Sequence, residues 1–136
     1  MKKIIAVILC FVTLFAATIT AYASSIQLYS NNVLTTNTTF SISSSRLANV
    51  KNTYSGITGT TKNAEIVTKV QKKIGLIWVT VSGGSWTDTS SATNFSKSHS
   101  VQLSSKGTYR AHVVFTISGT GGSDDKITKN VEKTYG

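Results

Sequence analysis

The stretch from residue 104 to residue 117 most constrains what this chain can fold into. Apolar side chains recur there at every second position, and the set is Tyr109, Ala111, Val113, Phe115 and Ile117. In an extended strand, alternate side chains point to the same face. The pattern therefore predicts a central strand that presents one continuous apolar face to a core.

The start of this strand indicates the fold class. Gly107 allows a tight turn, and Tyr109 can direct its hydroxyl back to the backbone of residues 105–107. A tyrosine corner of this kind introduces strand F of immunoglobulin-like sandwiches. Ala111 stands where antibody domains have their second disulfide cysteine, so the corner resembles theirs while the disulfide is absent. We predict an all-β, antiparallel, immunoglobulin-like β-sandwich.

The first 23 residues have the pattern of a secretory signal peptide. Met1-Lys2-Lys3 is basic, residues 4–19 are apolar, and Ala21 and Ala23 are the small residues that signal peptidase recognises. We expect cleavage after Ala23, which removes the single cysteine, Cys10. An uncleaved membrane anchor is the alternative, but the apolar run is shorter than the ~20 residues that a span requires. The prediction is a secreted, extracellular protein that contacts a membrane only before cleavage.

The chain from Ser24 onward contains neither cysteine nor proline, so its core alone must hold the fold together. Ser and Thr make up 37 of these 113 residues, with Ile, Val and aromatic residues spaced among them. That composition is typical of strands with one wet face. Without Lys2 and Lys3, 12 basic residues stand against 5 acidic ones, a net charge of +7. A basic surface favours anionic partners as a class.

Two parts of the secreted chain differ in pattern. Residues 24–45 are polar with scattered apolar positions, which is more typical of a flexible leader than of a structured element, an edge strand being the alternative. We therefore expect the sandwich domain to span residues 46–136. Alternation of apolar and polar positions predicts its strands over residues 46–54, 64–73, 76–81, 94–103, 109–117 and 126–135. Gly75 predicts a tight antiparallel hairpin between the second and third of these.

Several short motifs occur in an order that resembles a known group of proteins. They are Gln71-Lys72-Lys73, Trp78, Val81, Trp86 and Lys106-Gly107-Thr108-Tyr109-Arg110. The order is similar to that of small exported bacterial proteins grouped as a domain family of unknown function, over about residues 48–135. That family has an acidic-Thr pair early in its last strand, whereas this chain reads Asp124-Asp125-Lys126-Ile127-Thr128. The resemblance implies a secreted immunoglobulin-like sandwich and brings no activity with it.

Four residues are assigned structural roles. Trp78 and Trp86 are interpreted as packing against the core or the sheet, in preference to a platform on which a ligand stacks. Tyr109 and Gly107 are assigned to the tyrosine corner.

The titratable residues predict no catalytic site. A Ser-His-Asp site needs a histidine oriented by a buried acid, and the chain has no Gly-x-Ser-x-Gly motif to support one. His112 falls on the outward phase of the central strand, and His99 is expected near a sheet edge. Two histidines without cysteine or metal-ligand spacing predict no metal site. The glycine-rich stretches lack the context of a phosphate-binding loop. We therefore predict a protein that is not an enzyme and has no cofactor.

The remaining functional signal is the positive charge. Lys69 and Lys73 share the outward phase of residues 64–73, and Arg110 lies on the outward phase of the central strand. Immunoglobulin-like topology is expected to place these two strands in opposite sheets, which gives two separate basic areas. Both areas suit weak contact with a polyanion. Solubility of an exported β-protein is the competing explanation for the same residues.

By elimination, the chain is predicted to be an extracellular binding module or a protein associated with the cell wall. Its partner is expected to be an anionic cell-wall polymer, a glycan or another protein. A secreted bacteriocin-like antagonist is the alternative, but residues 24–136 lack the amphipathic helix that membrane-active peptides use. Nucleic acid is not expected, because export separates the chain from it.

Overall fold

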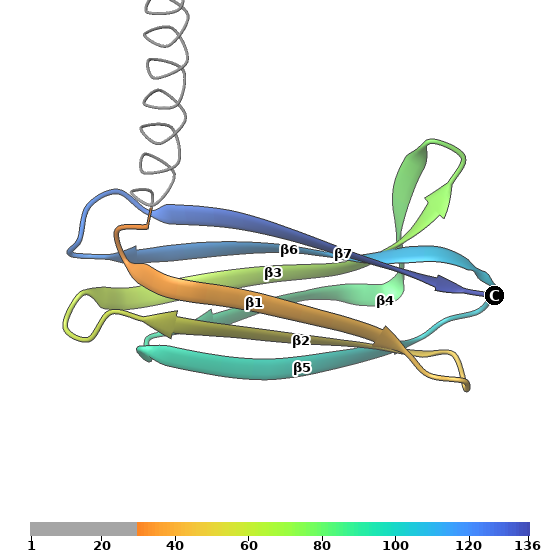
Figure 1. The fold of residues 1–136 in the computed structure, drawn as a ribbon, viewed down its shortest axis with the longest axis horizontal. Helices are drawn as coiled ribbons and strands as arrows, with labels where there is room; N and C mark the ends of the chain where they lie inside the picture. Colours follow the sequence, from red (N-terminus) through yellow and green to blue (C-terminus); the bar gives the residue numbers. More distant parts are fainter. Residues whose placement is uncertain (1–29) are drawn as a thin grey trace, which may run out of the picture. The chain divides into compact units, whose positions relative to one another are not determined.

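The computed structural model describes residues 30–136, and Asn31–Gly136 form one compact unit. Seven strands make up the unit: β1 (Val33–Ile42), β2 (Leu47–Gly56), β3 (Thr61–Ile74), β4 (Ile77–Ser90), β5 (Asn94–Gln102), β6 (Gly107–Gly119) and β7 (Asp125–Tyr135). They form a sheet of order β1-β2-β5 and a sheet of order β4-β3-β6-β7, and every pairing is antiparallel (Figure 1). The prediction of an all-β sandwich of two antiparallel sheets is confirmed.

The predicted signal peptide, residues 1–23, lies outside the described residues. No helix among residues 30–136 is long and apolar enough to cross a membrane.

The core lies between the two sheets, and β6 supplies its centre. Its five alternating apolar residues, from Tyr109 to Ile117, are all buried, as the sequence pattern predicts. The sheet opposite contributes Ala48, Val50 and Tyr54 from β2, which lie at alternate positions of that strand. Ile66 and Val70 complete the core from β3.

Strand β1 occupies much of the stretch expected to be a flexible leader. Val33 and Phe40 are buried, and β1 pairs with β2 along its length. The backbone N–H groups of Asn31 and Asn32 donate to the carboxylate of Asp125, at 2.8 and 2.6 Å. A register shift between Val33 and Thr35 interrupts the alternation. The inward positions therefore change phase within β1, and no regular pattern marks the strand in the sequence.

Strands β3 and β6 are hydrogen-bonded neighbours in the same sheet. Lys69 stands opposite His112, and Gln71 opposite Arg110. The expectation that these strands lie in opposite sheets, with two separate basic areas, is therefore wrong. Once β1 is counted, the strand at residues 64–73 is the third of the sandwich and not the second, so it belongs beside the central strand.

The β3–β4 hairpin predicted at Gly75 is confirmed, and it extends beyond the sandwich. Gly75 has φ of 63°, which suits the glycine position of a two-residue hairpin turn. The partner of β3 changes from Ser85 to Thr80 between Lys69 and Gln71, so residues 81–84 form a bulge in β4. Beyond the bulge, the green end of the hairpin projects from the sheets in Figure 1.

Candidate functional site

Cationic and aromatic side chains gather on the outer face of the four-stranded sheet. We call this surface the Trp78 patch, and its members are Lys69, Gln71, Lys73, Trp78, Arg110 and His112. On β3, alternate residues from Lys69 to Lys73 point outward, because the residues between them face the core side. Arg110 and His112 are their cross-strand partners on β6, and Trp78 pairs with Lys73 from β4. The patch therefore unites the three predicted polyanion contacts, Lys69, Lys73 and Arg110, on one surface.

Arg110 lies at the centre of the patch. Its guanidinium carbon is 4.4 Å from the centroid of the Trp78 ring, and its Nε donates to Oε1 of Gln71 at 2.8 Å. The Lys73 ammonium lies 5.9 Å from the same ring centroid. Such cation–π contacts hold a cation over the aromatic ring at the surface. The two terminal nitrogens of Arg110 make no hydrogen bond to any residue from 30 to 136, so they remain able to bind an anion in a bidentate manner.

The cations of the patch have no acidic partner within ion-pair distance among the described residues. The ion pairs found there both involve Asp88, on the other face of the sheet. Glu132 is the nearest acid by register, since it stands opposite Arg110 on β7. His112 adds an imidazole ring, with its Nδ1 2.7 Å from Oδ1 of Asn130. Because an amide carbonyl oxygen only accepts, Nδ1 of His112 is the donor in this hydrogen bond.

The two tryptophans have different surroundings. Trp78 is half-buried on the outer face, where its ring contacts the guanidinium of Arg110. Trp86 faces inward from β4, packs against the core and stacks on His99, with ring centroids 4.7 Å apart and an interplanar angle of 11°.

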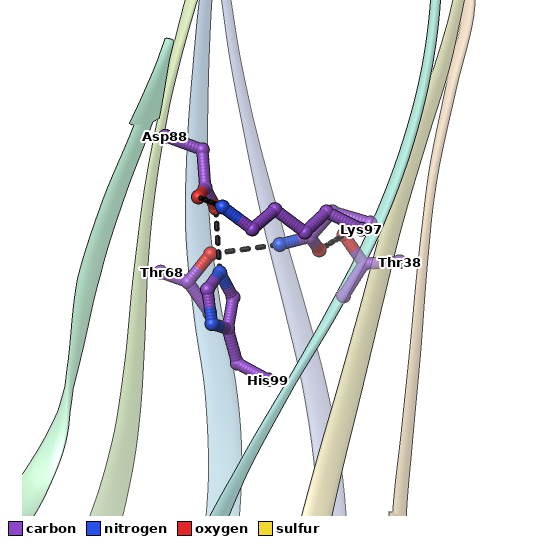
Figure 2. Close-up of polar contacts among 6 residues, drawn as sticks. Thr38, Thr68, Asp88, Lys97 and His99 are labelled. Carbon is purple, nitrogen blue, oxygen red and sulfur yellow. Dashed lines mark hydrogen bonds and ion pairs between the residues drawn. The ribbon is translucent and has the colours of Figure 1, made fainter.

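A cluster of one acidic and two basic side chains, Asp88, Lys97 and His99, joins β4 and β5, which are edge strands of the two sheets (Figure 2). The side chain of Asp88 is 5% exposed, its Oδ1 lies 2.7 Å from Nζ of Lys97, and its Oδ2 lies 2.6 Å from Nε2 of His99. Burial raises the pKa of Asp88, but the hydrogen bonds and charges of Lys97 and His99 outweigh it and hold the pKa below its ordinary value. Asp88 is therefore a carboxylate that links the sheets.

His99 is a histidine oriented by a buried acid, which sequence reasoning missed. Alternation in the sequence predicts no strand between residues 82 and 93, yet β4 continues to Ser90 and points Asp88 inward with Trp86. The signal was the alternation of Trp86, Thr87 and Asp88. No hydroxyl or thiol among residues 30–136 hydrogen-bonds to the other ring nitrogen of His99.

A second polar connection crosses the core nearby, and Figure 2 shows it beside Asp88. Thr38 of β1 donates to Oδ1 of Asn52 at 2.9 Å, and Nδ2 of Asn52 donates to Oγ1 of Thr68 at 2.7 Å. All three side chains are buried. These hydrogen bonds connect β1 and β2 to β3 in the opposite sheet, so they hold the two sheets together.

Tyr109 and Gly107 lie together at the start of β6. The Tyr109 hydroxyl donates to the carbonyl oxygen of Ser105 at 2.6 Å, the contact that a tyrosine corner requires. Gly107 has φ of 149°, and a Cβ there would lie 2.8 Å from Cε of Lys72. Lys72 in turn donates to Oγ of Ser105 at 2.6 Å, which fixes the same loop.

An open depression of about 560 Å³ lies at the far end of the outer face, lined by residues that include Asn63, Glu65, Thr89, Ser90, Thr116 and Ser118. Glu65 is its one ionisable residue. Residues 30–136 contain no group of three or more His, Cys, Asp or Glu side chains that could hold a metal ion. The Trp78 patch is thus the surface with the clearest chemical character.

Fold and patch together define a small β-sandwich with a cationic, aromatic surface on one sheet. No family model, curated protein or solved structure matches the chain, so its resemblance to small exported bacterial proteins stays a prediction.

Proposed function

We propose that this protein is a non-enzymatic, extracellular binding module whose Trp78 patch holds an extended polyanion, such as an anionic cell-wall polymer. The observation that carries the proposal is the grouping of Lys69, Lys73 and Arg110 on one face, without an ion-pair partner among residues 30–136. A surface that only maintains solubility has no need to gather its cations around a tryptophan.

An immunoglobulin-like topology is part of the proposal. The sheets β1-β2-β5 and β4-β3-β6-β7 correspond to the immunoglobulin constant-domain order with the fourth strand transferred to the opposite sheet. In this reading β6 is strand F, and Tyr109 is its corner tyrosine.

The shape of the patch favours a polymer over a small ligand. Its residues lie on the outer face of a sheet, where directly opposed side chains are separated by roughly 5 Å. Arg110 can bind a phosphate or carboxylate with its two terminal nitrogens, while Lys69 and Lys73 offer point charges on either side along β3. The Trp78 ring provides an apolar surface for the sugar or polyol between successive anions. Each contact is shallow, so affinity comes from several charges at once.

Co-sedimentation with purified cell walls tests this function. The chain from Ser24 onward should be retained at low salt and released as salt rises, because exposed charges are screened beyond ~8 Å at physiological ionic strength. Changing Lys69, Lys73 and Arg110 to Gln should abolish retention. The matched control changes Lys51, Lys62 and Lys126 to Gln, which removes the same charge from exposed positions outside the patch.

Glu132→Gln provides a test with the opposite sign. It removes the acid that stands opposite Arg110, so retention should increase. Walls stripped of their anionic polymer should retain none of these proteins. Lack of retention at low salt, or equal loss in the patch and control triples, would leave solubility as the explanation of the charge.

A further inference from the structure

The end of the β3–β4 hairpin carries a cluster of exposed aliphatic side chains. We call residues 74–79 the hairpin tip. The exposed fractions are 55% for Ile74, 97% for Leu76, 62% for Ile77 and 41% for Val79. Among the described residues, Leu34 is the one other large apolar side chain as exposed as these. Four aliphatic residues gathered in this way mark an interaction surface, since single exposed ones are ordinary.

The four aliphatic side chains of the hairpin tip do not belong to the core between the sheets. The bulge at residues 81–84 separates it from the rest of β4, and Figure 1 shows it standing away from the two sheets. The turn at Gly75 places Leu76 at the extreme end, with Ile74 and Ile77 paired directly behind it. The surface is therefore convex and narrow, which suits insertion into a partner better than acceptance of one.

The side chains of the hairpin change character from the turn inward. Trp78 and Lys73 form the next cross-strand pair, and Arg110 rests on the Trp78 ring. Between Glu65 and Asp88 the chain contains no acidic residue. From the turn inward, the aliphatic residues Ile74, Leu76 and Ile77 therefore come first, and the Trp78–Lys73 pair follows with Arg110 on the Trp78 ring. A lipid bilayer has the same order, since tryptophan prefers the interface and lysine or arginine the level of anionic headgroups.

We propose that the hairpin tip inserts into the headgroup region of a bilayer that contains anionic lipid. Leu76 and Ile77 enter deepest, Trp78 lies at the interface, and Lys73 and Arg110 contact the headgroup anions. The proposal goes beyond polymer binding and does not rest on it, because Leu76 and Ile77 lie outside the Trp78 patch. A second copy of the chain is the weaker occupant, since it would bring like charges together at Lys73 and Arg110.

Vesicle binding with tryptophan fluorescence tests insertion. The chain from Ser24 onward is suitable, because residues 31–136 have a core of their own. The chain has two tryptophans, so Trp86→Phe leaves Trp78 as the sole reporter. With vesicles of phosphatidylcholine and phosphatidylglycerol, the Trp78 emission should shift to shorter wavelength. Vesicles of phosphatidylcholine alone should bind more weakly, because they lack the anionic headgroup.

Substitution at the tip separates insertion from charge attraction. Changing Leu76 and Ile77 to Ser should lower the vesicle partition coefficient about tenfold or more, because two buried aliphatic groups are lost. Leu34→Ser, at an exposed position on β1, is the matched control and should change nothing. The Leu76 and Ile77 double variant should keep its retention on cell walls, so failure of this proposal and failure of polymer binding are distinguishable.

Two results would overturn the proposal. One is that the native chain does not bind the vesicles, or that the Leu76 and Ile77 double variant binds them as well as the native chain does. The other is a concentration-dependent dimer, measured by light scattering without lipid, that the double variant abolishes; the tip would then belong to a contact between copies.

Discussion

Tyr109 illustrates how much of this fold depends on one side chain. Its ring is 1% exposed within the core, and its hydroxyl reaches the carbonyl oxygen of Ser105. The residue thus joins the packing of the sandwich to the conformation of the loop before β6. The same residue was assigned from sequence, because a glycine and a tyrosine before an alternating strand form a local motif.

Replacing Tyr109 should separate these two contributions. Tyr109→Phe should lower the free energy of unfolding by about 1 kcal/mol, because it removes one hydrogen bond. Tyr109→Ala should lower it by about 3 kcal/mol or more, because it also leaves a cavity. Tyr135→Phe is the control, since that hydroxyl makes a 3.3 Å contact with the carbonyl of Ser44 at the surface. Urea denaturation that finds Tyr109→Ala as stable as the native chain would contradict the structural role.

Asp88 should make stability depend on acid pH. Its pKa in the folded chain lies below the ordinary value of 3.8, so the unfolded chain takes up this proton first as pH falls. The contribution of the Asp88 carboxylate to the free energy of unfolding is therefore fully present just above pH 3.8. It is lost as the pH falls from 3.8 through the lowered pKa of the folded chain. Asp88→Asn should cost about 1–3 kcal/mol at neutral pH.

Urea denaturation at a series of pH values measures this effect. The difference in unfolding free energy between the native chain and Asp88→Asn should have its full size just above pH 3.8 and shrink below it. If this difference stays the same or grows toward low pH, the contacts of Asp88 with Lys97 and His99 do not stabilise the folded chain.

Strand β1 determines how the other elements are arranged. It covers one edge of β2, buries Val33 and Phe40, and is fastened at its start to Asp125 of β7. Because of its register shift, β1 has no regular apolar alternation in the sequence. When β1 is not recognised, each later strand is assigned the number of the strand before it in the sandwich. Local alternation predicted β2, β3 and β6 well, because each has a regular apolar face. The order of strands in the sheets depends on pairing between distant segments, which no local pattern encodes.

A shortened chain tests the importance of β1. A chain that begins at Arg46, the expected start of the domain, should not fold, whereas one that begins at Asn31 should. Burial of Val33 and Phe40 contributes roughly 1.5–3 kcal/mol each, against a total stability of about 5–15 kcal/mol for a domain of this kind. Dispersed amide resonances in the NMR spectrum of the chain that begins at Arg46 would contradict this expectation.

Across the whole domain, burial of acidic side chains makes the surface more basic than the amino-acid composition indicates. Of the five acidic residues, Asp88 and Asp125 are buried, which leaves Glu65, Asp124 and Glu132 at the surface. The net positive charge was evident from sequence. Its concentration around Trp78 was not, because it depends on β3 and β6 being neighbours. The role of Trp78 was also hidden, since periodicity does not distinguish a tryptophan that faces the core from one that carries an arginine.

Titration of the isotope-labelled protein with purified anionic wall polymer, followed by amide and indole NMR shifts, tests the central claim most directly. Polyanion binding at the Trp78 patch predicts shifts at the Trp78 indole and at Lys69, Lys73, Arg110 and His112, with β1, β2 and β5 unchanged. The shifts should disappear at high salt. Shifts spread evenly over the surface, centred on the β1-β2-β5 sheet, or absent at low salt would contradict it.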